Sequence, residues 1–433
     1  MRHWLQDRHF RSLLKNSSYL AVSKGVAAVA GIATLAFVGR ALGLESFGVL
    51  ILIASYAQAA NGLAKFQSWQ VVVRYGGAAL SRGDVDTFKS SASFSLGLDL
   101  LSGFVGMAAA MLLLPLLAGW FGLPDKYLGM AMAYCLLIPT MGASSPTGML
   151  RALDRFDLIS WQGTVTPISR AILTGTAFFL HWSFPAFVAI WFVTDILGDL
   201  YLWMLTWREL RRRDLNHGIR PRLRPVGLAN AWPFAIQVNL TGSLYAAWTP
   251  IARLIVGGLL GPASAAIYRV AANLADSAQK PADLLSKAYY PEVVRMDLAS
   301  KHPWKLMLRG SATAGAFGLI AILILILGGR PLIGTLFGPA FLPVYPVLMI
   351  MIGLPLLTIV SFPLAPMLYS LDRPDAPLKA RLGGTLAYFA VVAPLCWRFG
   401  VLGAAAAIVL GQFVMVAMLT WYLRQEHRRV RRK

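Results

Sequence analysis

Two segments of this sequence that lie 218 positions apart are nearly the same, and this duplication constrains the fold. Residues 148–157 read Gly-Met-Leu-Arg-Ala-Leu-Asp-Arg-Phe-Asp and residues 366–375 read Pro-Met-Leu-Tyr-Ser-Leu-Asp-Arg-Pro-Asp, with six identities in ten positions. The same offset aligns residues 38–46 with residues 256–264. Because the offset is about half of the 433-residue chain, we predict two copies of one unit, residues 1–217 and 218–433.

The composition is that of a membrane protein. Hydrophobic residues make up 57% of the chain and charged residues 14%, and the mean hydropathy is +0.61. A chain of this size then has too few polar side chains to cover a water-exposed surface. Apolar runs of about 18–25 residues recur along it, and each is long enough to cross roughly 30 Å of hydrocarbon as a helix.

We predict twelve membrane-spanning helices, six in each copy of the unit. They lie near residues 16–38, 47–72, 92–118, 127–150, 158–181, 184–206, 229–254, 265–289, 307–327, 344–369, 382–397 and 402–423. An even number of spans gives the two copies the same orientation, and internal repeats are typical of secondary transporters. The predicted fold is an all-α integral membrane protein with two parallel six-helix repeats around a central cavity.

The net charge of +21 is distributed as expected for a membrane protein rather than for a nucleic-acid-binding protein. If the amino terminus is cytoplasmic, cytoplasmic segments hold about thirty of the 40 Lys and Arg residues. The opposite side then holds about four: Arg40, Lys126, Arg330 and Arg398. This positive-inside pattern predicts a multi-pass protein with both termini in the cytoplasm. We expect the basic segments to contact anionic membrane lipids and not nucleic acid.

Sequence signatures of enzyme chemistry are absent. No P-loop motif occurs, the six His and two Cys residues lack metal-ligand spacing, and no nucleophile–base arrangement stands out. The predicted outer loops are short, such as residues 182–185 and 398–400, so no external domain remains for chemistry on a polymer. We therefore expect that the protein is not an enzyme, that it uses no metal and no cofactor, and that it acts between its helices.

Charged side chains inside the spans are the candidate site residues. Each costs roughly 2.5–3.5 kcal/mol to place at mid-membrane, so such residues usually face a cavity or a partner. Five of the six basic ones fall on the first and second helices of the two copies: Lys24, Lys65, Arg253, Arg269 and Lys280. We predict that these five form a cationic substrate-binding cavity. The sixth, Arg170 in the fifth span, lies outside this set, and we interpret it as structural.

The eighth predicted span carries a polar stripe. Its polar residues follow steps of three and four, which places them on one helix face: Arg269, Asn273, Asp276, Lys280, Asp283 and Lys287. The matching stripe of the second span contains Gln58. We predict that the stripe faces a water-filled cavity, with Asp276, Asp283, Asn273 and Gln58 in supporting or coupling roles. In the alternative, Asp276 and Asp283 neutralise Lys280 and the stripe only packs the bundle.

Some of these charges have simpler interpretations. Arg253 and Arg269 lie near the outer ends of their spans, where their side chains could instead reach the lipid headgroups. Asp195 and Asp199 lie one turn apart in the sixth span and could relay protons or bind a cation. We interpret them as a solvated pair at the membrane interface.

Three short motifs resemble those of a known family. They are Asn16-Ser-Ser-Tyr19, residues 39–48 (Gly-Arg-Ala-Leu-Gly-Leu-Glu-Ser-Phe-Gly) and residues 399–407 (Phe-Gly-Val-Leu-Gly-Ala-Ala-Ala-Ala). With the chain length, the helix count and the duplication, they are similar to the bacterial polysaccharide flippases, the O-antigen-type members of the multidrug/oligosaccharidyl-lipid/polysaccharide exporter superfamily. The resemblance implies an inner-membrane protein with two six-helix lobes whose first two helices line the cavity. It also implies that an undecaprenyl-pyrophosphate-linked oligosaccharide is moved to the outer leaflet by alternating access.

The predicted charges suit such a substrate, because basic groups attract a diphosphate and polar groups accommodate sugars. The pathway would be surface-polysaccharide biosynthesis (lipopolysaccharide O-antigen, capsule or exopolysaccharide), whose polymerase and glycosyltransferases are possible partners. Lipid II is a less expected substrate, since lipid II flippases carry two additional helices. Two alternatives stay open. A cation-coupled multidrug antiporter of the same superfamily should show unpaired carboxylates in its site, and a membrane polymerase or ligase using the same lipid carrier should show a large external loop.

Overall fold

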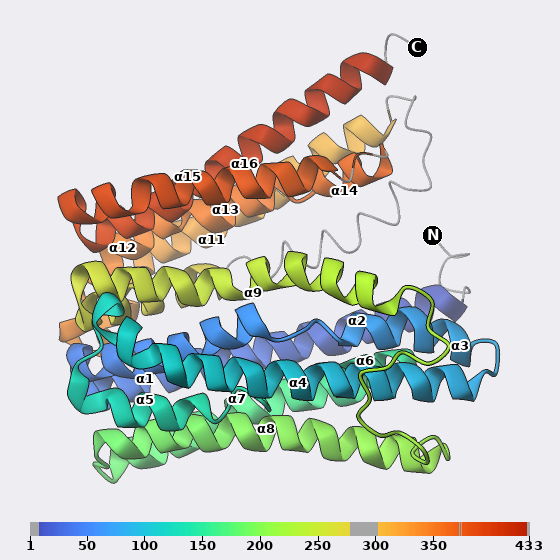
Figure 1. Ribbon diagram of the computed structural model, residues 1–433. Coiled ribbons are helices and arrows are strands. Elements are labelled where there is room, and N and C mark those ends of the chain that lie inside the picture. Colours follow the sequence, from blue (N-terminus) through green and yellow to red (C-terminus); the bar gives the residue numbers. More distant parts are fainter. Residues whose placement is uncertain (1–7, 278–301, 372, 374, 431–433) are drawn as a thin grey trace. The chain divides into compact units, whose positions relative to one another are not determined.

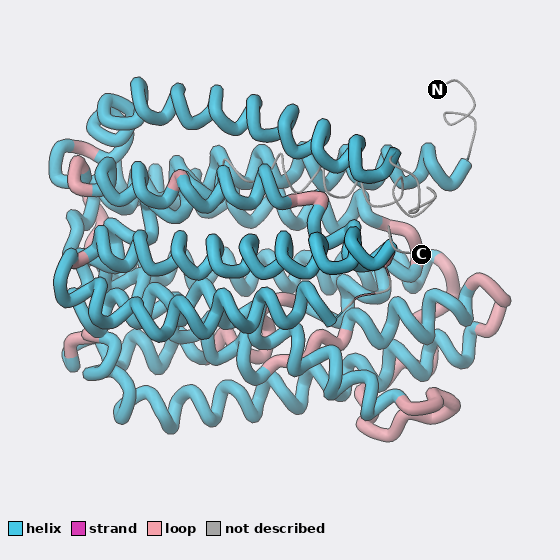
Figure 2. The backbone as a smooth tube through the Cα atoms, turned by 90° about the horizontal axis from the view of Figure 1, so that it is seen from above, coloured by secondary structure: helices cyan, strands magenta, loops and turns pink. Residues whose placement is uncertain are grey.

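The structure is a computed structural model that describes residues 8–277, 302–371, 373 and 375–430. These residues form helices joined by turns and short loops, with no strand among them (Figure 2). Six helical segments of this part of the chain are long and apolar enough to cross a bilayer: Ser23–Ala64, Val85–Phe121, Phe184–Arg212, Val344–Tyr369, Asp375–Phe399 and Val401–His427. The prediction of an all-α integral membrane protein is confirmed.

The first of two compact units comprises residues 1–258. Its main helices are α1 (Arg8–Ala64), α2 (Trp69–Val71), the π-helix η2 (Val72–Gly77), α3 (Ala78–Leu80), α4 (Val85–Leu117), α5 (Leu128–Cys135), α6 (Ser144–Ala152), α7 (Phe156–Phe179), α8 (Phe184–Arg212) and α9 (Ala231–Leu260). Two short 3-10 helices, η3 (Ala118–Phe121) and η4 (Asp125–Tyr127), lie between α4 and α5. In Figure 1, α1 runs beside α7 and α4, and α7 packs in turn on α8.

The second unit comprises residues 259–433. It contains a helix at 262–277, then α11 (His302–Phe337), η5 (Pro339–Phe341), α12 (Val344–Met351), α13 (Gly353–Ser361), α14 (Leu364–Ser370), α15 (Asp375–Phe399) and α16 (Val401–Val430). α15 and α16 pack along each other, and α12 and α13 pack on α16 and on α11.

The duplication is visible in the backbone. α1 contains the first two predicted spans because Gly43 interrupts the helix with a left-handed φ of 70°. Gly261, which is 218 positions later, has a φ of 84° and lies between α9 and the next helix. Glycine adopts this region at no steric cost. The aligned segments 38–46 and 256–264 therefore form the same kind of connection in both copies.

Three predicted spans are not continuous helices. The second is broken at residues 65–68, the fourth between α5 and α6 at residues 136–143, and the tenth divides into α12, α13 and α14. Pro139 and Gly142 lie in the second of these breaks. Proline removes a backbone donor and disrupts a helix, and glycine accommodates the turn that follows. A broken helix leaves backbone polar groups that buried side chains must satisfy.

α9 starts the second copy of the sequence but packs in the first unit. Its start joins an apolar cluster of Val71, Phe94, Leu98, Leu228, Ala231 and Ala235. Near the end of α9 the backbone approaches the turn after α4 closely. A Cβ atom on Gly257 would lie 2.8 Å from the Phe121 carbonyl oxygen, and one on Gly258 would lie 2.0 Å from the Trp120 carbonyl oxygen. The packing boundary thus falls after residue 258, whereas the duplication boundary falls after residue 217. The assignment of two six-helix lobes, 1–217 and 218–433, stays a prediction.

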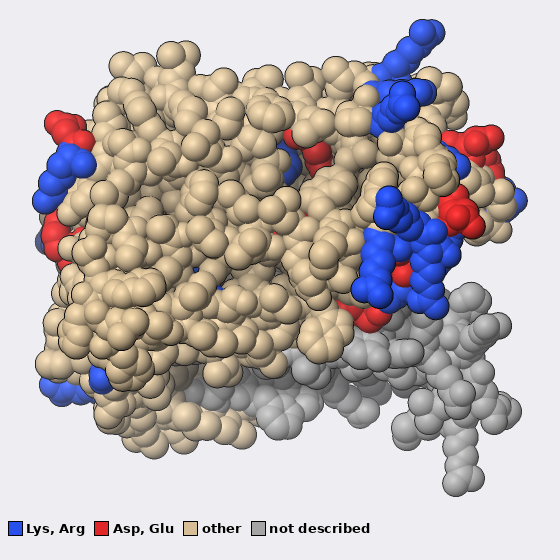
Figure 3. Space-filling view, turned by 90° about the horizontal axis from the view of Figure 1, so that it is seen from below, with Lys and Arg blue, Asp and Glu red and all other residues tan. Residues whose placement is uncertain are grey.

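Charge is distributed on the surface as a bilayer requires. On the face drawn in Figure 3, Lys, Arg, Asp and Glu side chains gather at two opposite ends, and little charge is visible in the broad band between them. Large apolar side chains are exposed on the long helices, including Leu112 at 76% and Leu327 at 73%. Such a band can face hydrocarbon, where a charged side chain would be costly.

Candidate functional site: a polar cavity between η2 and α9

A buried carboxylate ties together the two interrupted helices of the first unit. Asp99 on α4 is 5% exposed and accepts hydrogen bonds from the Ser68 hydroxyl, the Ser145 backbone N–H (2.8 Å) and the Ser145 hydroxyl (2.7 Å). Ser68 ends the first break, and Ser145 lies in the first turn of α6 after the second. Ser95, one turn before Asp99, donates to the Ser68 carbonyl oxygen (3.1 Å). This network fixes the two breaks relative to each other, because a buried charge requires its lone pairs to be satisfied.

The ammonium group of Lys65 lies between the same two breaks. Lys65 follows the last residue of α1 and is 6% exposed. Its Nζ donates to the carbonyl oxygens of Pro139 (3.2 Å) and Met141, both in the turn between α5 and α6. These bonds satisfy carbonyl groups that the broken helix leaves without helical partners. An ammonium has three donors, so Lys65 retains one N–H for a further ligand.

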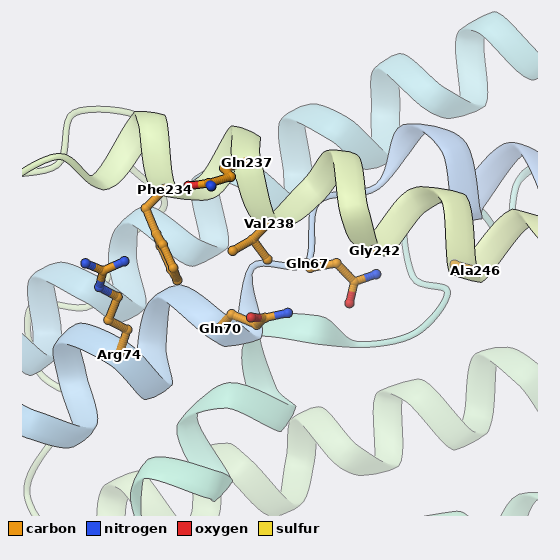
Figure 4. Close-up of a pocket in the computed structure, with 8 residues that line it drawn as sticks. All are labelled: Gln67, Gln70, Arg74, Phe234, Gln237, Val238, Gly242 and Ala246. Atoms are coloured by element: carbon orange, nitrogen blue, oxygen red, sulfur yellow. The ribbon is translucent and has the colours of Figure 1, made fainter. Parts of the chain in front are cut away.

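A cavity of about 760 Å³ lies between the α2–η2 segment and α9 (Figure 4). Its lining residues are Gln67, Gln70, Arg74, Phe234, Gln237, Val238, Gly242 and Ala246. The volume falls within the roughly 300–1,000 Å³ of small-molecule sites. The walls therefore combine three side-chain amides, one guanidinium and one aromatic ring.

A smaller cavity of about 230 Å³ adjoins the first and shares Gln67 and Ala246 with it. Its wall also contains Asn61, Lys65 and Trp69, together with residues of the α5–α6 turn and α6. The Oδ1 atom of Asn61 is buried and has no hydrogen-bond partner among the described residues. None of the described residues that line either cavity is an Asp or a Glu.

Gln67 is held in one orientation. It lies in the break between α1 and α2, and its Oε1 accepts a hydrogen bond from Trp69 Nε1 (3.0 Å). Because its acceptor is engaged, its amide N–H group is the part available to a ligand. The side chain crosses α9 at Gly242, where a Cβ atom would lie 2.5 Å from Gln67 Cγ and 3.3 Å from its Nε2. Gly242 thus leaves the room that Gln67 occupies.

Arg74 lies at the other end of the cavity from Gln67 (Figure 4). Its guanidinium carbon is 4.2 Å from the centre of the Phe234 ring on α9. Stacking on a ring uses the face of a guanidinium and leaves its N–H edges available for hydrogen bonds to anions. Arg74 is also exposed, so a ligand can reach it.

Contacts of the segment before α9 with α4 and η2 position α9, which forms one wall of the larger cavity. The Arg222 N–H donates to the Ser93 carbonyl oxygen (3.0 Å), and a Cβ atom on Gly97 would lie 2.3 Å from the Arg222 carbonyl oxygen. The Tyr75 hydroxyl donates to the Ala229 carbonyl oxygen (2.8 Å). The start of α9 is therefore held beside η2.

The structure brings two of the predicted site residues together. Arg253 on α9 is 6% exposed, and its Nη1 donates to Gln58 Oε1 on α1 (3.3 Å). A buried guanidinium does not extend to the headgroups, so the alternative interpretation of Arg253 is wrong. Neither residue lines the two cavities described above.

The other predicted residues differ in exposure. Lys24 is exposed on α1, and Arg269 (partly exposed), Asn273 (partly exposed) and Asp276 (exposed) lie on the helix at 262–277 of the second unit. Lys280 and Asp283 lie outside the described residues. The stripe of the eighth span and the substrate roles of Lys24, Lys65, Arg253 and Arg269 stay predictions.

Asp195 and Asp199 are not a solvated pair, so that interpretation is wrong. Asp195 forms an ion pair with Arg170 and accepts a hydrogen bond from the Tyr134 hydroxyl (3.1 Å). Arg170 also donates to the Thr194 hydroxyl (2.8 Å), which agrees with its structural interpretation. The Asp199 carboxylate accepts the backbone N–H of Gly142 and lies near Lys65. Both carboxylates therefore stabilise helix packing, because each accepts a hydrogen bond from a residue on a neighbouring element.

The duplicated motif builds the same ion-pair cluster in each unit, here called the clasp. In the first unit, Arg155 binds Asp157 (2.9 Å) at the start of α7 and the buried Glu209 near the end of α8. In the second unit, the clasp consists of Arg373, Asp375 at the start of α15 and Glu426 near the end of α16. Hydrogen bonding to Arg155 lowers the pKa of Asp157, and the two carboxylates raise the pKa of Arg155. The pKa of Arg373 is raised for the same reason.

None of the described residues that line the larger cavity is among the predicted site residues. Gln67, Gln70 and Arg74 are spaced by three and four positions, a spacing that in a sequence indicates one face of a helix. That spacing was the available signal, but neutral amides draw less attention than charges within an apolar span. Phe234 and Gln237 give no such signal, because a single aromatic residue or amide in a span has many ordinary roles.

The fold defines the class as an all-α, multi-pass membrane protein. Residues 13–296 match the polysaccharide biosynthesis protein family, and the chain belongs to that family. It is 37% identical to the inner membrane protein YghQ of Escherichia coli (strain K12) over 347 residues, which cover 80% of this chain and 98% of that protein. The predicted resemblance to the polysaccharide flippase family and the predicted multi-pass membrane location are confirmed.

Solved structures of transporters share the fold. An inward-facing multidrug resistance MATE family transporter of the MOP superfamily aligns with a TM-score of 0.74 and 14% identity, covering 94% of this chain and 96% of that one. The lipid II flippase MurJ in an inward closed conformation aligns with a TM-score of 0.68 and 11% identity, covering 95% and 89%. At these identities the likeness shows the fold alone.

Proposed function

We propose that the protein is a flippase that moves an undecaprenyl-pyrophosphate-linked oligosaccharide across the inner membrane during surface-polysaccharide biosynthesis. Membership of the polysaccharide biosynthesis family supports the pathway. The name of the relative YghQ, an inner membrane protein, supports the location. The protein acts by transport and not by catalysis, and both of its termini are cytoplasmic.

The observation that carries this proposal is the chemistry of the two adjoining cavities. Their walls contain three glutamines, Asn61, Arg74 and Lys65, and the described lining residues include no carboxylate. Basic groups attract a diphosphate, and amides both donate to and accept from sugar hydroxyls. A site for a cationic drug would instead require carboxylates that face the ligand. Asp99 and Asp199, the described carboxylates that interact with Lys65, are already engaged by backbone or side-chain donors.

The proposed substrate is hard to move across a bilayer because its two ends differ in polarity. A lipid-linked oligosaccharide has a head group too polar to cross hydrocarbon and a prenyl chain that is stable in it. A polar cavity that takes the head group while the chain stays in lipid lowers the barrier without burying charge in hydrocarbon. Arg74 and Lys65 supply the compensating positive charge.

A deletion strain and reconstituted vesicles test the proposal. Deletion should stop surface-polysaccharide production and leave lipid-linked oligosaccharide in the inner leaflet. Purified protein in vesicles should move a fluorescent undecaprenyl-pyrophosphate-linked oligosaccharide between leaflets, and Arg74→Ala should slow this movement. Lys126→Ala, at a basic residue of η4 away from the cavities, is the matched control and should move the lipid at the wild-type rate. Normal polysaccharide with increased sensitivity to cationic dyes in the deletion strain would favour the antiporter and overturn the proposal.

A further inference from the structure

We propose that the cavity between η2 and α9 is a glycosyl-phosphate subsite, in which Gln67 determines specificity for the sugar and Arg74 binds the phosphate attached to it. This inference rests on the proposed function, because it names which part of the lipid-linked oligosaccharide this cavity takes. It separates recognition of the first sugar from recognition of the diphosphate charge.

The sugar end of the subsite is defined by amides. Gln67 presents N–H donors, since its carbonyl oxygen already accepts from Trp69 Nε1 (3.0 Å), and Gln70 lines the same cavity. A sugar hydroxyl or acetamido oxygen accepts from such a donor, and Gln70 supplies both a donor and an acceptor. A site built on hydrogen bonds discriminates against a ligand that lacks the matching group, because its polar groups are then left unpaired.

The anionic end of the subsite is defined by Arg74. Its guanidinium carbon lies 4.2 Å from the centre of the Phe234 ring, and this cation–π contact leaves N–H groups for a phosphate. Arg74 and Gln67 lie at opposite ends of one cavity, with Gln70 between them (Figure 4). A ligand that reaches both ends needs hydroxyl or amide groups beside its phosphate. The ligand class is therefore a sugar phosphate group and not an isolated phosphate.

Two further residues position Gln67. Trp69 fixes the orientation of the amide, and Gly242 leaves space for the side chain on α9. A methyl group on residue 242 would meet the flexible Gln67 side chain and no backbone atom among its three nearest neighbours. Gly242→Ala should thus displace Gln67 without preventing folding.

Binding to purified full-length protein in lipid nanodiscs tests the subsite. The probes are farnesyl diphosphate and farnesyl diphosphates that carry glucose, galactose or N-acetylglucosamine. The wild type should bind at least one glycosylated probe more tightly than bare farnesyl diphosphate. Gln67→Ala should weaken binding of that probe by roughly three- to tenfold, the loss of one or two hydrogen bonds, and leave bare farnesyl diphosphate unchanged. Arg74→Ala should weaken all probes by a similar factor.

Matched variants exclude a general structural effect. Gly242→Ala and Trp69→Phe should reproduce the selective loss, whereas Gly129→Ala, at a helical glycine with nothing within 4 Å of its Cβ position, should bind all probes as the wild type does. Each variant should keep the wild-type melting temperature. Equal binding of bare and glycosylated probes by the wild type, or an equal effect of Gln67→Ala on both, would refute the subsite while the proposed function stands. Binding of no probe by the wild type would instead count against the proposed function.

Discussion

At the scale of single residues, the contacts of each buried charge indicate its role. Asp99 receives three hydrogen bonds from the two helix breaks, and Lys65 donates to two carbonyl groups of one of them. Arg74, by contrast, is exposed at a cavity and stacks only on aromatic rings in the described contacts. The first two residues stabilise the breaks that shape the site, and the third is accessible to a ligand.

Replacement of Asp99 by Ala should destabilise the protein. The variant removes the acceptor of the buried Ser145 backbone N–H and the carboxylate partner of the Ser68 and Ser145 hydroxyls, at a cost of about 1–3 kcal/mol. The melting temperature in detergent should fall by many degrees, with a smaller fall for Asp99→Asn, which keeps one acceptor oxygen. Asp86→Ala, at an exposed position in the first turn of α4, is the control and should melt close to the wild type. A wild-type melting temperature for Asp99→Ala would show that the network contributes no stability.

Lys65 and Lys24 should respond differently to loss of charge. Lys65→Met removes two bonds to buried carbonyl groups, so both the melting temperature and the flipping rate should fall. Lys24 is exposed on α1, so Lys24→Met should lower the flipping rate at an unchanged melting temperature, with partial rescue by Lys24→Arg. Flipping in vesicles and thermal unfolding are measured on the same preparations. Wild-type flipping by a stable Lys24→Glu variant would remove Lys24 from the substrate site.

At the scale of helices, the clasp explains why the duplicated motif is retained in both copies. In each unit it joins the start of one helix to a buried glutamate (Glu209 or Glu426) near the end of the next. The preceding residues of the motif share a structural role as well. Met149 and Met367 are buried in equivalent apolar clusters, and Gly148 in the first unit lets α6 approach Trp69.

Breaking one clasp should cost measurable stability. Arg155→Ala should destabilise the protein by about 1–3 kcal/mol, because Glu209 loses a buried partner and retains only Arg213. The double variant Arg155→Ala with Glu209→Gln should recover part of that loss in thermal unfolding. Since Arg155 lowers the pKa of Asp157, the contribution of Asp157 is present above its unfolded pKa of about 4 and is lost as the pH falls through the lower folded value. An Arg155→Ala variant that melts as the wild type does at neutral pH would contradict the role of the clasp.

Helix positions were predictable from the sequence to a greater extent than helix continuity. Runs of apolar residues located the spans, because spanning length is fixed by the bilayer. The breaks at residues 65–68 and 136–143 were missed, although Pro139 and Gly142 are ordinary signals for the second of them. The first break contains neither residue type, and it depends on Asp99 and Ser145, which come from other helices. Such tertiary stabilisation leaves no local pattern.

At the scale of the whole molecule, the prediction that remains to be tested is orientation. In a background that lacks the buried residues Cys135 and Cys396, single cysteines at Asp214 and Phe399 should be labelled from opposite sides of the membrane. A membrane-impermeant thiol reagent added to intact spheroplasts should label position 399 and not position 214. Both positions are exposed in the structure, so burial does not explain a missing signal. Labelling of position 214 alone would reverse the topology.

The candidate site was only partly predictable from the sequence. Charges inside spans were visible, and two of the predicted residues, Gln58 and Arg253, do meet. The cavity itself requires that α9, from the second copy of the sequence, lie against η2 from the first. No local spacing encodes a contact between residues so far apart in the chain, such as Gln67 with Gly242.

The packing of α9 also has a consequence for biogenesis. A ribosome delivers the helices to the membrane in order, and the first sequence copy is complete when residue 217 has been made. The wall of the cavity and the close backbone contact of Gly257 and Gly258 with Trp120 and Phe121 do not exist at that moment. They form only after the basic segment at 208–224 has been retained on its side of the bilayer and α9 has been inserted. A nascent chain arrested before residue 258 therefore carries an unfinished first unit, and one arrested before residue 228 also lacks Leu228, Ala231 and Ala235, which pack with Phe94 and Leu98.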